Sequence, residues 1–174
     1  MSIEESRRDE TRSTATSPGR SLPLRPRNLA EERRRAMPYF TEIQPFYDIA
    51  DELFARLSED RKIKEKALAS KLIVCFAFRD PDGELWIDCT GDEIVVRPGK
   101  QDLTAAATLT MDTDVAHRFW LGKLNLIKSL GSGEIVSDGS VPKLLKLLPV
   151  IKPAFKIYPE ILKEKGLGDI VDVN

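Results

Sequence analysis

Histidine and cysteine are scarce in this sequence of 174 residues, which holds one histidine and two cysteines. The single histidine, His117, nearly excludes a histidine-based metal site and leaves little for Ser–His or Cys–His catalysis. Two cysteines are too few for a disulfide scaffold, so a reduced, cytoplasmic setting is expected. No stretch approaches the roughly 18 unbroken apolar residues of a transmembrane helix, and no N-terminal export signal is expected. A soluble globular protein remains, and 41% hydrophobic and 32% charged residues fit that class.

Motifs of catalysis are missing as well. The run Gly131-Ser132-Gly133 is too short for a dinucleotide-binding loop, and no Gly-x-Ser-x-Gly nucleophile elbow occurs. Asp88, beside a tryptophan, and His117, which is expected at the surface or half-buried, are the remaining acid–base candidates. A sequence without a catalytic constellation favours a binding protein. No catalytic residue, cofactor or metal is therefore expected.

The charges are unevenly distributed although the net charge is −1. Residues 1–35 hold nine arginines and six acidic residues, with almost no large apolar side chains. Such a segment cannot bury enough apolar surface to offset chain entropy, so residues 1–36 are predicted to be a disordered Arg-rich tail. Acidic residues dilute its arginines and no aromatic residue lies among them, so nucleic-acid binding is not expected. Residues 37–174 are predicted to form one domain.

A second basic segment lies near the C-terminus, where residues 141–165 hold six lysines and two glutamates. These lysines are either solvated charges on an amphipathic helix or contacts for anionic surfaces such as phosphate headgroups. The residues assigned to headgroup contact are Lys143, Lys146, Lys152 and Lys156.

Hydrophobic periodicity predicts the elements between the two basic segments. A helical stripe begins at Pro45 and ends at Leu57, and a short second helix is expected within 58–70. Further short helices are expected around Phe119 and Ile127. The predicted strands cover residues 71–79, 85–89, 93–97, 107–111 and 134–137.

The first two strands are predicted to form a hairpin around the turn Asp80-Pro81-Asp82-Gly83. In the predicted register Phe78 faces Leu85 and Phe76 faces Ile87. This pairing makes one face of the hairpin wholly apolar, whereas a slip of one residue would mix the faces.

Prolines interrupt the apolar stripe at the C-terminus. Pro149, Pro153 and Pro159 each remove a backbone donor, which predicts two or three short helical pieces over the sheet instead of one helix. The pieces are expected to end before Gly166. This broken segment is either the ordinary cover of a core or a mobile lid over a ligand.

Several motifs occur in a fixed order along the second half of the chain. They are Thr108-Leu109-Thr110-Met111, then Phe119-Trp120 with Gly122-Lys123-Leu124-Asn125, then Gly133-Glu134-Ile135 leading to Asp138-Gly139, and finally Leu144-Leu145-Lys146-Leu147-Leu148-Pro149. In this order they resemble the sterol carrier protein type-two family. The hairpin with Trp86-Ile87-Asp88 is similar to the family's sheet, and the resemblance covers roughly residues 42–165.

The resemblance implies an α+β fold in which helices cover a mostly antiparallel five-stranded sheet, with an apolar tunnel between the layers. It also implies a non-catalytic carrier of fatty acids, fatty acyl-CoA, sterols or similar lipids. The candidate tunnel wall consists of residues on the predicted inward faces. These are Phe76, Phe78, Ile87, Leu109, Met111, Phe119, Trp120, Ile127, Leu148, Ile151 and Phe155.

Three hypotheses for function follow. The leading one is a soluble lipid-binding or lipid-transfer protein, with a lipid ligand and a transient anionic membrane surface as partners. The alternative is a protein-interaction or dimerisation module, whose apolar face seals against a lipid-metabolising enzyme or a second copy of the chain. The third is a small enzyme that uses Asp88 or His117.

Overall fold

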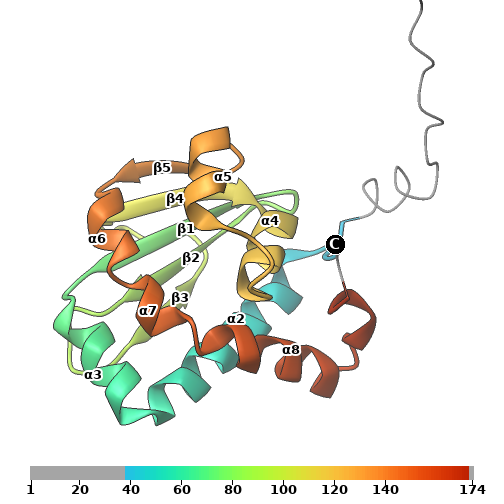
Figure 1. The fold of residues 1–174 in the computed structure, drawn as a ribbon, viewed down its shortest axis with the longest axis horizontal. Helices are drawn as coiled ribbons and strands as arrows, with labels where there is room; N and C mark the ends of the chain where they lie inside the picture. Colours follow the sequence, from blue (N-terminus) through green and yellow to red (C-terminus); the bar gives the residue numbers. More distant parts are fainter. Residues whose placement is uncertain (1–37, 173–174) are drawn as a thin grey trace, which may run out of the picture.

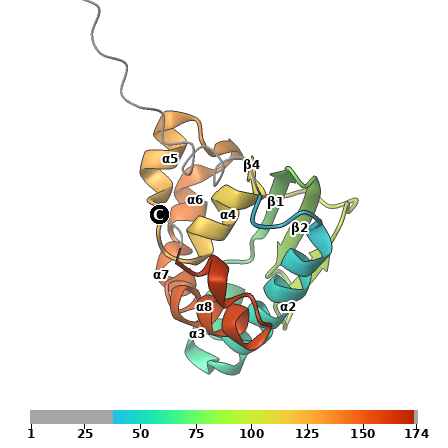
Figure 2. The same cartoon turned by 90° about the vertical axis from the view of Figure 1, so that its right-hand side faces the viewer.

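A computed structural model describes residues 38–172, and the segment predicted to be a disordered tail lies outside these residues. One layer of the fold is a five-stranded sheet, and the other is a set of helices gathered on one side of it (Figures 1 and 2). The predicted α+β class is confirmed.

The strand order in the sheet is β3-β2-β1-β4-β5. The central strands β1 and β4 are parallel, and the other three pairings are antiparallel, so the sheet is mostly antiparallel as predicted. The strands are β1 Ile73–Arg79, β2 Gly83–Asp88, β3 Val95–Pro98, β4 Ala107–Asp112 and β5 Val136–Gly139.

The register of the β1–β2 hairpin differs from the predicted one by two residues. Phe76 pairs with Leu85 and Phe78 pairs with Gly83. A slip of two residues leaves every side chain on its predicted face, because side chains alternate with a period of two. The apolar pattern therefore fixes the face and leaves this slip open. Packing at the turn selects the observed register, since the Tyr47 hydroxyl accepts a hydrogen bond of 2.9 Å from the Glu84 N–H.

The helices follow the predicted positions closely. Asp60 ends the first predicted helix and begins the second, because its side chain accepts hydrogen bonds from the N–H groups of Lys62 and Ile63. The helices are α2 Ile43–Glu59, α3 Arg61–Ala69, α4 Thr113–Trp120, α5 Leu126–Ser132, α6 Val141–Leu145, α7 Leu148–Ile151 and α8 Ala154–Glu164, and a 3-10 turn, η1, covers Gly168–Ile170.

Two of the three C-terminal prolines end or begin a helix as predicted. Pro149 lies in the first turn of α7 and Pro153 is the N-cap of α8. Pro159, however, lies inside α8 and does not interrupt it. The lost hydrogen bond costs roughly 3 kcal/mol, and the burial of Tyr158, Ile161 and Leu162 around it offsets this cost.

The core lies between the sheet and the helices. On the strand face that points toward the helices, β1 and β4 carry buried apolar side chains. Helix α2 supplies the opposing stripe, in which Ile49 and Leu53 are fully buried. The aromatic ring of Phe46 meets that of Phe78 edge to face, with centroids 5.0 Å apart. This contact joins α2 to the centre of the sheet.

Gly139 ends β5 with a backbone conformation that other residues rarely adopt, because its φ is +95°. A Cβ at this position would lie 2.5 Å from the carbonyl oxygen of Ala106. We expect Gly139→Ala to lower the free energy of unfolding by about 2–3 kcal/mol in urea denaturation.

Gly131, in helix α5, is the matched control, since a Cβ there meets nothing within 4 Å. Gly131→Ala is expected to raise stability by up to about 1 kcal/mol. Equal effects of the two alanines would contradict the assignment of strain to Gly139.

Candidate functional site

An apolar cavity lies between the helix-facing side of the sheet and helices α2, α3, α6 and α7. Its volume is about 50 Å³. Among residues 38–172, no charged residue contributes to its wall. The lining residues are Phe54, Leu57, Ile63, Ala67, Val74, Phe76, Ile87, Cys89, Ile94, Trp120, Leu144, Leu147, Val150 and Ile151.

The cavity lies where short side chains from the sheet and from the helices face one another. Ala67 of α3, Val74 of β1 and Cys89 after β2 contribute short side chains to the wall. Larger residues frame the cavity, with Phe54 and Trp120 in edge-to-face contact at a centroid distance of 5.7 Å. Small residues framed by rigid aromatic rings leave a space that the chain does not fill.

The cover of the cavity is thinner on the side of α6 and α7 than on the side of α2. Helix α2 buries seven residues, whereas α6 buries only Leu144 and α7 buries none completely. Leu147, Val150 and Ile151 reach the cavity while remaining half-buried. The walls formed by 141–152 and by α3, which buries only Ala67, are therefore held by fewer buried residues than the wall formed by α2.

Four of the predicted wall residues line the cavity, namely Phe76, Ile87, Trp120 and Ile151. Four more are buried in the core without contributing to this lining, namely Phe78, Leu109, Met111 and Phe119. Leu148 and Phe155 are half-buried and do not contribute to this lining, and the Phe155 ring meets that of Phe119 at a centroid distance of 5.8 Å.

The prediction that Ile127 faces inward is wrong, because its side chain is 65% exposed. Helix α5 spans seven residues and buries Leu126 and Ser129 instead. The helical spacing of Leu124, Ile127 and Leu130 suggested an inward face, but in so short a helix the spacing defines the buried side poorly.

Helices α2 and α3 also contribute to the wall, which was not predicted. Phe54 and Leu57 belong to the apolar stripe that predicted α2, and Ile63 and Ala67 belong to the one that predicted α3. The apolar stripes in the sequence therefore already contained these wall residues. What the sequence did not indicate is which part of each stripe meets the hollow and which part meets solid core.

The cavity offers no group for acid–base or nucleophilic chemistry at neutral pH. Its one thiol belongs to Cys89, and burial raises the pKa of this thiol to about 11. Cys75 points to the other face of the sheet, and burial likewise raises the pKa of its thiol to about 12. Both thiols stay protonated, so Cys89 acts as a small apolar residue in the wall.

The other two candidate residues have structural partners. The Asp88 carboxylate accepts hydrogen bonds from the N–H and hydroxyl of Thr90 and pairs with Arg97 at 3.6 Å. Hydrogen bonds from Thr90, with Arg97 beside them, lower the pKa of Asp88. This network fastens the end of β2 to β3 and does not face the cavity.

His117 is fully buried, which corrects the expectation of a surface or half-buried side chain. The Ile170 carbonyl can only accept, so His117 Nε2 carries the proton and donates to it over 2.8 Å. His117 Nδ1 then accepts from the Tyr158 hydroxyl over 2.9 Å. One ring thus connects α4 to α8 and to η1.

Within residues 38–172, no cluster of three or more His, Cys, Asp or Glu residues is arranged to hold a metal ion. None of the helices in this part of the chain is both long and apolar enough to cross a bilayer.

The sheet covered by helices, with an apolar cavity between the layers, defines an α+β protein, and comparison with known proteins places it in a family. A family model described as the SCP-2 sterol transfer family matches residues 50–152. The match spans more than half of the chain, and the chain belongs to this family. Curated proteins give no match by sequence.

Solved structures of sterol carrier proteins share the fold. The sterol carrier protein domain 2 of Helicoverpa armigera is 19% identical with a TM-score of 0.53, over 69% of this chain and 93% of that one. The apo form of Sterol Carrier Protein 2 from Yarrowia lipolytica is 19% identical with a TM-score of 0.52, over 63% of this chain and 88% of that one.

A larger protein also contains a similar region. The sec-alkylsulfatase Pisa1 from Pseudomonas sp. is 18% identical with a TM-score of 0.46 over 50% of this chain. This chain spans 14% of the length of that sulfatase.

The buried His117 makes stability depend on pH. Burial lowers the pKa of His117 from 6.5 to about 4. The unfolded chain therefore binds a proton that the folded chain excludes between these two values. The stability contributed by the neutral ring is present above pH 6.5 and is lost as the pH falls toward 4, by up to about 3 kcal/mol.

Urea denaturation across this pH range, on the natural chain and on His117→Gln, checks the prediction. Carboxylates titrate in both proteins, so the difference between the two curves isolates His117. Parallel curves would show that His117 does not take up a proton on unfolding.

Proposed function

We propose that this protein is a non-catalytic lipid carrier that holds an apolar ligand in the cavity between its sheet and its helical cover. The observation that carries the proposal is a wall without charged residues, in a chain of the SCP-2 sterol transfer family. Such a wall selects for hydrocarbon and gives a polar or charged molecule no partner. The ligands that fit this chemistry are a fatty acid, a fatty acyl-CoA or a sterol.

The size of the cavity requires that the cover moves when a ligand enters. Sites for ligands of this size measure roughly 300–1,000 Å³, whereas the cavity measures about 50 Å³. The weakly buried helices α6 and α7 are the cover that yields. Outward displacement of Leu147, Val150 and Ile151 enlarges the space next to Phe76 and Trp120. The present cavity is then the inner end of the binding site.

The energetics allow such a carrier to bind reversibly. Each buried methylene contributes about 0.8 kcal/mol, so a chain of about 15 methylenes gains at most ~12 kcal/mol. Association and ordering cost roughly 4–15 kcal/mol, and opening the cover adds to this cost. Micromolar affinity is therefore the tightest that these magnitudes give, and such reversible binding suits a protein that must also release its ligand.

The interaction-module alternative receives no support from the described residues. It requires the apolar face of the sheet to seal against a partner. That face is already covered by α2 and by the C-terminal helices of the same chain (Figure 2).

Filling the cavity tests the proposal. Ala67 of α3 lines the cavity and is buried, whereas Ala69 of the same helix is exposed. We expect Ala67→Met to weaken fatty-acid binding at least ~10-fold, because a flexible side chain of this size occupies the hollow without forcing the layers apart. Ala69→Met, the matched control, should bind as the natural chain does.

Tryptophan fluorescence supplies the measurement. In a Trp86→Phe background, Trp120 in the cavity wall is the one remaining tryptophan. A brominated fatty acid should quench its emission in the control, and Ala67→Met should need at least ~10-fold more fatty acid for the same quenching. Equal quenching of both variants would show that the ligand reaches Trp120 without occupying the space beside Ala67 and would contradict the assigned site. Absence of quenching in the Trp86→Phe protein would remove the lipid-carrier proposal.

A further inference from the structure

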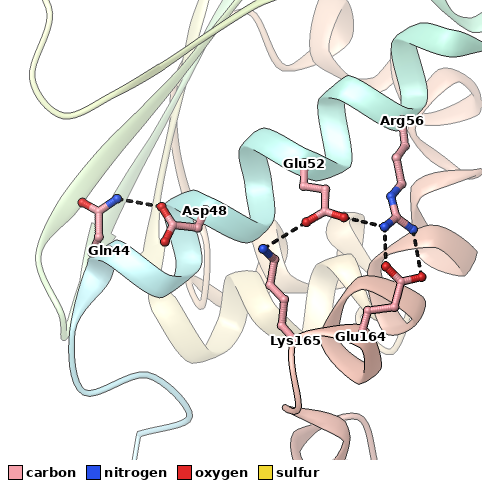
Figure 3. A network of polar contacts seen from close by, with 6 residues as sticks. All are labelled: Gln44, Asp48, Glu52, Arg56, Glu164 and Lys165. Carbon is pink, nitrogen blue, oxygen red and sulfur yellow. Dashed lines mark hydrogen bonds and ion pairs between the residues drawn. The ribbon is translucent and has the colours of Figure 1, made fainter.

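Charges on α2 and α8 neutralise one another in a network that joins the two helices (Figure 3). Arg56 contacts both carboxylate oxygens of Glu164 and one of Glu52. Lys165 Nζ lies 3.0 Å from the other carboxylate oxygen of Glu52. Lys165 and Arg56 lower the pKa of Glu52, and Arg56 lowers that of Glu164, so both carboxylates stay ionised.

Four lysines just upstream have a different environment. Lys143, Lys146, Lys152 and Lys156 are exposed, and none of them forms an ion pair with any residue of 38–172. The sequence between residues 141 and 159 contains no aspartate or glutamate. The charge on this stretch is therefore uncompensated locally, although the chain as a whole has a net charge of −1.

The same stretch is one wall of the cavity. Leu144, Leu147 and Ile151 point to the cavity while the lysines remain in solvent. Lys143 in α6 and Lys146 at its C-cap are three residues apart, which places them on one side of that helix. Lys152 is the C-cap of α7, and Lys156 lies in the first turn of α8. The cover is thus apolar toward the ligand space and cationic on its outer side.

Both ends of the stretch are fixed. At the start, the Ser140 N–H donates to the Ala106 carbonyl over 2.9 Å. At the end, α8 is held by the hydrogen bond between Tyr158 and His117 and by the network with α2. Movement that opens the cavity is thereby confined to the cationic segment between these anchors.

We propose that Lys143, Lys146, Lys152 and Lys156 form a docking surface for an anionic lipid bilayer, which brings the cover of the cavity against the membrane. The proposal rests on the lipid-carrier function. A bilayer fits this surface better than an acidic protein does, because the half-buried Leu145 and Leu148, which do not line the cavity, lie beside the lysines in the sequence. A bilayer offers an apolar phase to these side chains and anionic headgroups to the lysines.

Vesicle binding tests this surface. The probe is a vesicle of phosphatidylcholine with phosphatidylserine, compared with phosphatidylcholine alone, and co-sedimentation of the full chain is the readout. Each lysine near an anionic surface contributes about fivefold to the partition coefficient, so Lys146→Gln/Lys152→Gln should lose about 25-fold. Raising the salt concentration should weaken binding of the natural chain, since it screens these charges.

A double variant at two other lysines changes the net charge by the same amount and serves as the control. Lys100 and Lys128 are exposed and lie outside the cover, in the loop after β3 and in α5. Lys100→Gln/Lys128→Gln should keep binding within about twofold. An equal loss in both double variants would reduce the effect to net charge and overturn the docking surface.

Fatty-acid quenching of Trp120 separates this proposal from the function on which it rests. The Lys146→Gln/Lys152→Gln variant should retain quenching by a soluble brominated fatty acid, because neither lysine contacts the cavity. Quenching without any binding to anionic vesicles would overturn the docking surface and leave the carrier intact. Vesicle binding without quenching would overturn the carrier instead. Binding to soluble polyglutamate in place of vesicles would assign the surface to an acidic protein.

Discussion

Helix α2 and the segment formed by α6 and α7 both cover the apolar face of the sheet, but α2 buries many more residues there. The properties of the site depend on this difference. Helix α2 contributes a long stripe with fully buried Ile49 and Leu53, so its separation from the sheet would expose much of the core. Helix α7 buries no residue completely. Separating α7 from the sheet costs far less free energy than separating α2, because the apolar side chains of α7 are already half exposed to solvent. The cavity lies where the weaker cover meets the sheet, and any change of its volume begins there.

The elements of the fold were predictable because each has a local cause. Helix α2 follows from an apolar stripe, the boundary at Asp60 from a side chain that caps a helix, and the β1–β2 hairpin from alternation around a turn. The register of that hairpin was not predictable, since a shift of two residues preserves both faces. Its choice depends on Tyr47, which is distant in sequence and bonds to Glu84 only in the folded chain.

The candidate site was predictable in part, for a related reason. Periodicity indicates that Phe76, Trp120 and Ile151 face inward, and the structure places all three in the cavity wall. It does not distinguish a wall from solid core, so Phe78 was predicted with equal weight although it packs against Phe46. Burial of His117 was missed because its two partners, Tyr158 and the Ile170 carbonyl, come from the C-terminal segment and leave no trace near residue 117.

The prolines of the C-terminal segment explain how one stretch of chain can yield while its neighbours stay fixed. Helices of five and four residues, as α6 and α7 are, have no stability of their own in water. They keep their shape through contacts with the cavity wall, and Pro149 and Pro153 prevent them from merging into a longer helix. A single long helix over the sheet would couple every contact and would open only as a whole. Division into short pieces lets one piece move while α8 remains attached to α2 and to His117. In the proposed lipid carrier, the segmentation that removes backbone hydrogen bonds makes a small cavity compatible with a larger ligand.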